Sequence, residues 1–348
     1  MDRFAQMQNL LDKSKFFKLV CGAGNEDKQE VKKLSIIYTL AGAKGLDISA
    51  NAEIVKACNE GMEYAYSIAP SLGINIGLKP YITVSVGMPG DHHVRKAFIN
   101  PEGCIKCDLC IPVCPTDAIP DELIIKEPKC IGCGNCSAIC PVDTITYYHN
   151  EKELLKVLPG CLEAGAEHIE LHAAVAEDKY IMKEWEIINQ VNKYNHVSMC
   201  LDRLHLSNFA LEERVKKAKE ISGDRLIIQA DGYPMSGGED DFNTTLQAIA
   251  ITDVINKKFN KYMDNQAMKT VYKNKNEINI LVSGGTNSLT AELARQNDVR
   301  FQGISIGTYA RKIVKDYLSH PDFYNDLNVI KGAYRVAKEL VTASVGEI

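Results

Sequence analysis

Short apolar segments alternate with longer amphipathic segments along most of the chain. The apolar segments have the length and the β-branched content of strands, and they cover 16–24, 45–49, 81–87, 168–174, 196–202, 225–231, 278–285 and 301–308. Each is followed, directly or after an insertion, by a segment with helical spacing, over 27–43, 52–71, 151–165, 179–194, 211–221, 244–263, 288–296 and 310–318. Alternating strands and helices predict a parallel sheet, because each helix returns the chain to the start of the next strand.

Eight strand–helix units predict an α/β fold of TIM type, the (β/α)8 barrel. Such barrels take about 250 residues, and the 348 residues of this chain leave room for extensions. A doubly wound open sheet is the alternative. After the first strand, however, the dinucleotide fingerprint G-x-G-x-x-G is incomplete, since only Gly22 and Gly24 are present.

One segment, between the third strand and its helix, interrupts the barrel pattern. It divides the chain into a first barrel part over 1–88, a ferredoxin-like α+β insert over 89–149, a second barrel part over 150–318 and a C-terminal helical extension over 319–348. Because the insert follows a strand, we expect it at the C-terminal end of the barrel, where barrels bind their ligands.

Two cysteine runs in this insert carry the strongest chemical signal. Each has the spacing C-x2-C-x2-C-x3-C-P, from Cys104 to Pro115 and from Cys130 to Pro141. In such runs the first three thiolates bind one [4Fe–4S] cluster, and the fourth binds the cluster of the other run. The predicted ligands of cluster A are Cys104, Cys107, Cys110 and Cys140. The predicted ligands of cluster B are Cys130, Cys133, Cys136 and Cys114.

Structural zinc and disulfides are the alternatives for these cysteines. Zinc sites show paired C-x2-C instead of runs of three closed by C-P. Disulfides are typical of secreted proteins, and the N-terminal segment lacks the order of charged and apolar residues found in signal peptides. Residues 100–147 resemble a complete bacterial two-cluster ferredoxin. That resemblance implies one-electron transfer at low potential.

The loops after the seventh and eighth strands predict a phosphate site. Barrels often bind phosphate there through backbone N–H groups. The candidate residues are Ser283, Gly284, Gly285, Thr286, Gly307, Thr308 and Arg311. The phosphate would belong to flavin mononucleotide (FMN) or to a phosphorylated substrate. Glycines that only form turns are the alternative.

Acid–base candidates come from the fourth and sixth strands. Glu170 and His172 alternate along one strand and therefore share a side, and Asp231 ends another strand. Each could instead be a hydrogen-bonded polar group of the barrel interior. The Gly-rich segment 230–243 predicts a lid.

Four cysteines lie outside the two runs. Cys21 and Cys200 end strands and are expected to face the barrel mouth, whereas Cys58 and Cys161 lie in helices and are expected to pack in the core.

Composition adds few constraints. The net charge is −5, and 24% of the residues are charged, as in ordinary soluble proteins. No basic block suggests nucleic-acid binding, and no apolar run is long enough for a membrane span. A cytoplasmic protein is predicted.

Three more segments connect the chain with a known family. They are "QADGYPMSGG" (229–238), "SGGTNS" (283–288) and "GISIGTYARKIV" (303–314), all downstream of the cysteine runs. Together with those runs they resemble the light-dependent period A protein family of cyanobacteria. The family is described as iron–sulfur proteins that sense the redox state of the cell and feed the circadian clock. The resemblance implies the barrel architecture and a redox function.

Two functions therefore remain open, besides a structural cluster on an inactive barrel. The first is an iron–sulfur redox protein whose two clusters transfer electrons to a partner protein or sense redox state through a ligand bound in the barrel. The second is an iron–sulfur oxidoreductase that acts with FMN or on a phosphorylated substrate, with Glu170, His172 or Asp231 moving protons.

Overall fold

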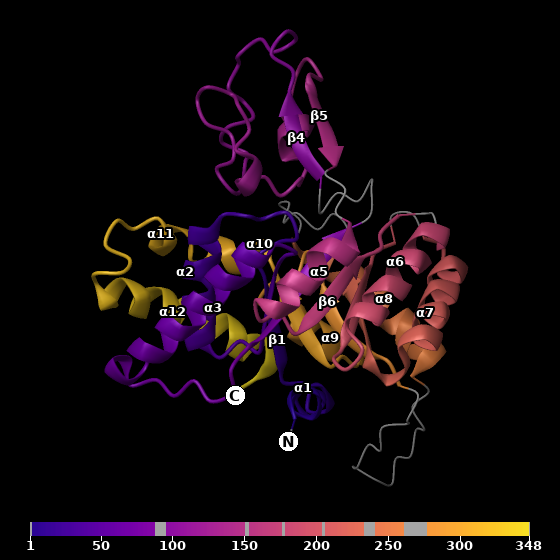
Figure 1. Cartoon of the computed structure of the whole chain (residues 1–348). Coiled ribbons are helices and arrows are strands. Elements are labelled where there is room, and N and C mark those ends of the chain that lie inside the picture. Colours follow the sequence, from indigo (N-terminus) through magenta and orange to yellow (C-terminus); the bar gives the residue numbers. More distant parts are fainter. Residues whose placement is uncertain are drawn as a thin grey trace.

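Eight parallel strands close into a barrel in the computed structural model (Figure 1). The structure describes residues 2–87, 95–149, 153–175, 178–203, 206–232, 241–260 and 277–347. In the order in which they neighbour one another, the strands are β1 (Phe16–Val20), β10 (Gly303–Ile306), β9 (Asn279–Ser283), β8 (Leu226–Asp231), β7 (Val197–Leu201), β6 (His168–His172), β3 (Tyr81–Gly87) and β2 (Gly45–Ser49). The predicted barrel is confirmed. The open-sheet alternative is wrong, because β1 pairs with β2 on one side and with β10 on the other.

Helices surround the barrel and alternate with its strands. They are α2 (Lys28–Ala41), α3 (Ala52–Ile68), η1 (Pro70–Leu72), α5 (Leu154–Glu163), α6 (Asp178–Val191), α7 (Asn208–Ser222), η3 (Gly223–Arg225), α8 (Asp241–Phe259), α9 (Thr290–Gln296), α10 (Thr308–Lys312) and α11 (Lys315–Leu318). Local signals fix the ends of α2. The Asp27 side chain accepts hydrogen bonds from the first turn, and Gly42 ends the helix with a φ of 95°.

The helix predicted over 310–318 is two short helices, α10 and α11. The carbonyl of Ala310 accepts a hydrogen bond of 2.6 Å from the hydroxyl of Tyr38 in α2. The N–H of Val314 bonds instead to the carbonyl of Arg311, three residues earlier. This tighter turn interrupts the helix at Val314.

Two further helices lie at the chain ends. α1 (Arg3–Asp12) covers the end of the barrel where the strands begin, with Met7 and Leu11 packed against Phe16, Tyr81 and other side chains of that end. α12 (Leu327–Val345) packs against α2 and α9. In the part of the chain that the structure describes, no helix is both long enough and apolar enough to cross a membrane.

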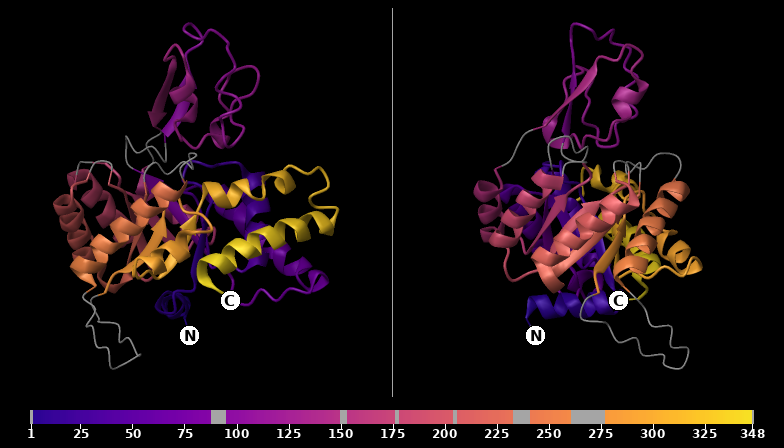
Figure 2. Two further views of the ribbon diagram at one scale, coloured as in Figure 1. Left: turned by 180° about the vertical axis from the view of Figure 1, so that it is seen from behind. Right: turned by 90° about the vertical axis from the view of Figure 1, so that its right-hand side faces the viewer.

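The segment between β3 and α5 forms a small separate sheet. β4 (Arg95–Ile99) pairs antiparallel with β5 (Ile145–His149), and between them lie η2 (Glu127–Lys129) and α4 (Asn135–Ile139). We call residues 95–149 the cysteine segment. It stands over the end of the barrel opposite α1 (Figures 1 and 2). This is the end that the strands point to, so the segment lies beside the barrel mouth.

Candidate functional site

One cavity of the cysteine segment is lined by the four cysteines predicted for cluster A: Cys104, Cys107, Cys110 and Cys140. Most of its other walls are apolar side chains, including Ile99, Leu123 and Ile145. The backbone N–H of Lys106 donates to Cys104 Sγ at 3.4 Å. The spacing rule and the folded chain therefore group the same thiols.

A second cavity is lined by the four cysteines predicted for cluster B: Cys130, Cys133, Cys136 and Cys114. Backbone N–H groups again point to sulfur, from Ala118 to Cys114 Sγ at 3.2 Å and from Ala97 to Cys130 Sγ at 3.4 Å. The hydroxyl of Tyr147 lies 3.7 Å from Cys136 Sγ. Such donors stabilise sulfur that carries negative charge.

These two sets of donors fit iron–sulfur clusters. Burial, and to a lesser degree the neighbouring sulfurs, raise the pKa of Cys133 to about 11, and burial also raises the pKa of Cys136. A cation bound between neighbouring thiols favours their ionised form. Thiols grouped in apolar cavities with N–H donors to sulfur are the environment that iron–sulfur clusters use.

Lys96 joins the cysteine segment to the barrel. Its buried ammonium donates to the carbonyl oxygens of Gly24, Glu127 and Cys130. Gly24 belongs to the loop after β1, and in the same loop the N–H of Glu26 donates to the carbonyl of Pro128 at 2.7 Å. The second group of cysteines therefore lies next to the barrel mouth.

Inside the barrel, a buried lysine is held between two carboxylates. Lys18 Nζ of β1 lies 2.7 Å from Asp47 Oδ2 and 2.7 Å from Glu170 Oε2, and all three side chains are at most 2% exposed. Burial opposes the charge of Lys18, but the two carboxylates outweigh it and raise the pKa of the lysine. An ammonium held in this way is not an amine nucleophile.

The two carboxylates differ in their surroundings. Burial raises the pKa of Asp47. Burial also acts on Glu170, but Lys18 and then His172 outweigh it, so the pKa of Glu170 is lowered. Ser198 and Gln229 donate hydrogen bonds to Glu170 at 2.6 and 2.9 Å. Glu170 is therefore the more readily ionised member of the pair.

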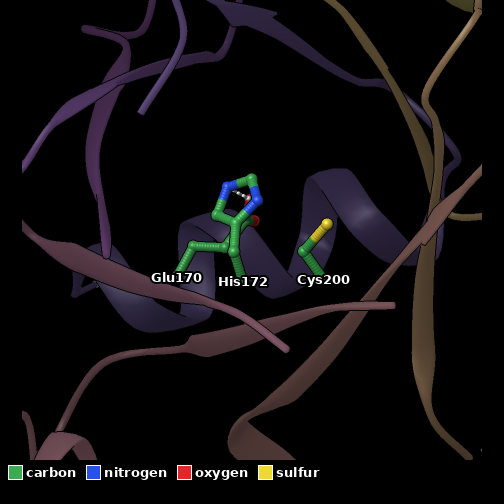
Figure 3. A group of neighbouring side chains, drawn as sticks. All are labelled: Glu170, His172 and Cys200. Atoms are coloured by element: carbon green, nitrogen blue, oxygen red, sulfur yellow. Dashed lines mark ion pairs between the residues drawn. The ribbon is translucent and has the colours of Figure 1, made fainter. Parts of the chain in front are cut away.

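Glu170 and His172 lie side by side, as their alternation along one strand predicts (Figure 3). His172 Nε2 is 3.5 Å from Glu170 Oε1. Cys200 of β7 joins them, and the ligand atoms of the three residues lie within 4.8 Å of one another. Such a group could hold a metal ion, but the ammonium of Lys18 already neutralises Glu170. Proton transfer through His172 suits the group better.

Other candidate residues are placed elsewhere. Asp231 ends β8, in register with Ser283 of β9, and is not part of the group in Figure 3. Of the predicted lid over 230–243, residues 233–240 lie outside the described residues. Cys21 is buried directly after β1, whereas Cys58 and Cys161 are buried in α3 and α5.

The residues of the predicted phosphate site lie in two loops with different surroundings. Ser283 ends β9, and Gly284 and Gly285 follow it. The carbonyl of Gly285 accepts hydrogen bonds from Thr244 and Thr245 of α8 at 3.2 and 2.8 Å. The hydroxyl of Thr286 donates to the carbonyl of Ser305 at 2.6 Å. Gly307 precedes α10, and Thr308 and Arg311 of α10 line a cleft below the cysteine segment, together with Lys312 of the same helix.

Two buried lysines at the site were not identified from the sequence. Lys18 lies within an apolar strand, and a charge at such a position is the signal that could have indicated a buried ion pair. Lys96 has no comparable signal, because its partners are backbone carbonyls from two segments distant in the sequence, at Gly24 and at Glu127 and Cys130.

Comparison with known proteins gives consistent matches along the chain. The light dependent period A Fe–S cluster-binding domain matches residues 100–151, and the light dependent period A C-terminal domain matches residues 161–343. The protein "Light dependent period A" of Synechococcus elongatus is 29% identical over 224 residues, which cover 64% of this chain and 62% of that protein. The match thus spans less than two thirds of the relative's length.

Solved structures whose backbone can be superposed on this chain share little sequence identity with it. The YdjI aldolase from Escherichia coli K12 has a TM-score of 0.47 and 7% identity, covering 98% of this chain and 94% of its own. GGGPS from Thermoplasma volcanium has a TM-score of 0.44 and 8% identity, covering 100% and 99%.

Proposed function

Because this chain belongs to the light dependent period A family, we propose that it is a redox protein with two [4Fe–4S] clusters, which transfers electrons or senses redox state near the mouth of its barrel. The observation that carries the proposal is the pair of cavities, each lined by one of the two sets of cysteines that the spacing predicts. When bound, the clusters supply one-electron transfer. The ferredoxin-like domain is assigned to 89–149, between barrel parts 1–88 and 150–318, with a C-terminal extension over 319–348.

The two groups of cysteines differ in accessibility, which supports exchange between solvent and barrel. In the first group Cys107 is exposed, and the neighbouring Ile105 is 60% exposed. The second group adjoins the barrel through Lys96. A redox partner protein would therefore reach the first group, and a ligand at the barrel mouth would lie near the second. We assign the protein to the cytoplasm, because free thiols and such clusters need a reducing compartment.

Metal and sulfide analysis of anaerobically purified protein tests this function. We expect about eight iron and eight sulfide per chain, and about half of each after Cys107→Ser or Cys133→Ser. The matched control is Cys161→Ser, a buried helix cysteine outside both cavities, which should leave both contents unchanged. Zinc in place of iron, or iron without sulfide, would overturn the proposal.

The group in Figure 3 favours a second candidate, an iron–sulfur oxidoreductase that acts with FMN or on a phosphorylated substrate. In that function the ionised Glu170 would orient His172, and His172 would move a proton to or from the substrate. Release of stoichiometric flavin on heating would establish FMN as a bound cofactor. Protein that releases no flavin and binds none when FMN is added would exclude the flavin form.

A further inference from the structure

A cleft of about 540 Å³ lies between the cysteine segment and the outer rim of the barrel. The segment contributes Cys114 and the residues beside it, and the barrel contributes the start of α2 together with α10 and α11. The volume is within the range of small-molecule sites. The cleft lies outside the barrel interior, and none of the residues in Figure 3 lines it.

Arg311 is the buried cation of this cleft. Its side chain is 9% exposed, and within the described residues its Nε and Nη1 atoms have no hydrogen-bond partner. A buried guanidinium normally has its donors paired, because an unpaired buried donor is costly. The two unpaired N–H donors of Arg311 are therefore suited to acceptors that come from outside the chain. Guanidinium N–H groups form strong, charge-assisted hydrogen bonds with the oxygens of a phosphate or carboxylate group.

The charges around Arg311 favour a phosphate group over a single carboxylate. Besides Arg311, four lysines line the cleft: Lys33, Lys129, Lys312 and Lys315. Three carboxylates also line it: Asp27, Glu30 and Asp117. Two of these are already paired, Asp27 with Lys129 at 3.4 Å and Asp117 with Lys315 at 3.0 Å.

The remaining carboxylate, Glu30, is the one that interacts electrostatically with Arg311. Burial raises the pKa of Glu30, and its side chain is hydrogen-bonded to Asn25. With Lys33 and Lys312 added, positive charge is in excess, as a doubly charged anion requires.

We propose that this cleft binds the phosphate group of a small molecule, with Arg311 as its principal ligand and Lys33 and Lys312 as supporting charges. The inference deepens the proposed function and rests on it only for the cluster beside Cys114. A phosphate bound here lies at the junction of the barrel and the cysteine segment, so its occupancy can affect both.

Calorimetric titration of the purified holoprotein with inorganic phosphate tests the proposal. We expect binding to the wild type, at least tenfold weaker binding to Arg311→Gln, and unchanged binding to Arg335→Gln, an exposed arginine of α12 that does not line the cleft. No binding to the wild type, or equal binding to Arg311→Gln, overturns the proposal. Iron and sulfide are measured on the same samples, so a failure of the clusters is recognised separately from a failure of anion binding.

Titration with FMN and with riboflavin distinguishes the sources of the phosphate. Riboflavin lacks the phosphate. Tighter binding of FMN than of riboflavin, with the difference abolished by Arg311→Gln, therefore supports a phosphorylated flavin as the ligand. Binding of inorganic phosphate without FMN supports a smaller phosphate compound.

If Arg311→Gln does not fold, phenylglyoxal labelling of the wild type provides the second measurement. Phosphate should protect Arg311 but not Arg335 from modification, as read by mass spectrometry. Equal labelling of Arg311 with and without phosphate overturns the proposal.

Discussion

In the barrel, one apolar core extends from β1 to α12, and the buried charges of Lys18, Asp47 and Glu170 are paired inside it. In the cysteine segment, three of the eight buried core residues are cysteines, and the others are small or aliphatic. Five of the seven non-glycine residues with positive φ in the described chain also lie there: Lys106, Asp108, Asp117, Leu123 and Asp143. Such backbone costs about 1 kcal/mol per residue. The barrel is thus stabilised by burial, whereas the segment depends on what its thiols bind.

Removal of iron should separate the two regions most clearly. Under anaerobic chelation we expect residues 95–149 to lose all measurable protection from amide exchange, because ligand binding and folding are coupled there. Trp185, the chain's single tryptophan, is buried in α6 and reports on the barrel alone. The thermal midpoint of barrel unfolding, followed by Trp185 fluorescence, should move by less than about 4 °C. Joint unfolding of both regions on chelation would contradict the comparison.

Replacement of Lys18 by Met should destabilise the barrel and spare the segment. It leaves Asp47 and Glu170 buried without their cation, which costs about 3–5 kcal/mol. Urea unfolding followed by Trp185 fluorescence measures the loss, and cluster absorbance in the native protein should not change. Lys257→Met is the control, because Lys257 is 72% exposed in its pair with Asp253 and should leave the midpoint unaltered. A loss of unfolding free energy below about 1 kcal/mol for Lys18→Met would show that Lys18 is not held between Asp47 and Glu170 as described.

Lys96→Met acts on the junction of the two regions. It removes an ammonium that donates to three carbonyls, so the opening free energy of the amides at Lys129 and Cys130 should fall by about 2–3 kcal/mol in hydrogen exchange. The unfolding of the barrel, read from Trp185, should not change. Lys129→Met removes a more exposed pair with Asp27 and should have little effect. Equal effects of the two variants would refute the assignment of the junction to Lys96.

A change of pH should have the smallest effect, and only on the barrel. Burial, with His196 next in importance, lowers the pKa of His168 well below its usual value of 6.5. The unfolded chain therefore binds a proton below pH 6.5 that the folded chain does not, and stability is lost as pH falls. Between pH 7.5 and 5.5 the loss from this group is about 1.4 kcal/mol. Urea unfolding measures the free energy of unfolding of the wild type and of His168→Gln at both pH values. The wild type should lose about 1.4 kcal/mol more than the variant between pH 7.5 and 5.5. Equal losses in the two proteins would contradict this role of His168.

The parts predicted from sequence are those that local chemistry determines. The spacing of eight cysteines identified both cavities, and the strands over 45–49 and 81–87 have the same bounds in the structure. α1 was not predicted, because it buries only Met7 and Leu11 at the closed end of a barrel that other segments form. The pairing of Lys18 needs β1, β2 and β6 to be brought together. The cleft at Arg311 exists only where the cysteine segment meets α10, so periodicity in the chain could not indicate it.

The pairing of β4 with β5 has a consequence for how such a protein can arise. Arg95 lies opposite His149 in register, so the cysteine segment begins and ends at neighbouring points. The entropy of closing a loop depends on its ends and only weakly on its length. For the eight-stranded framework, the whole cysteine segment is therefore equivalent to one short turn. A gene could gain, exchange or lose it by recombination within a single loop, and each ancestor along that route would still encode a barrel that folds.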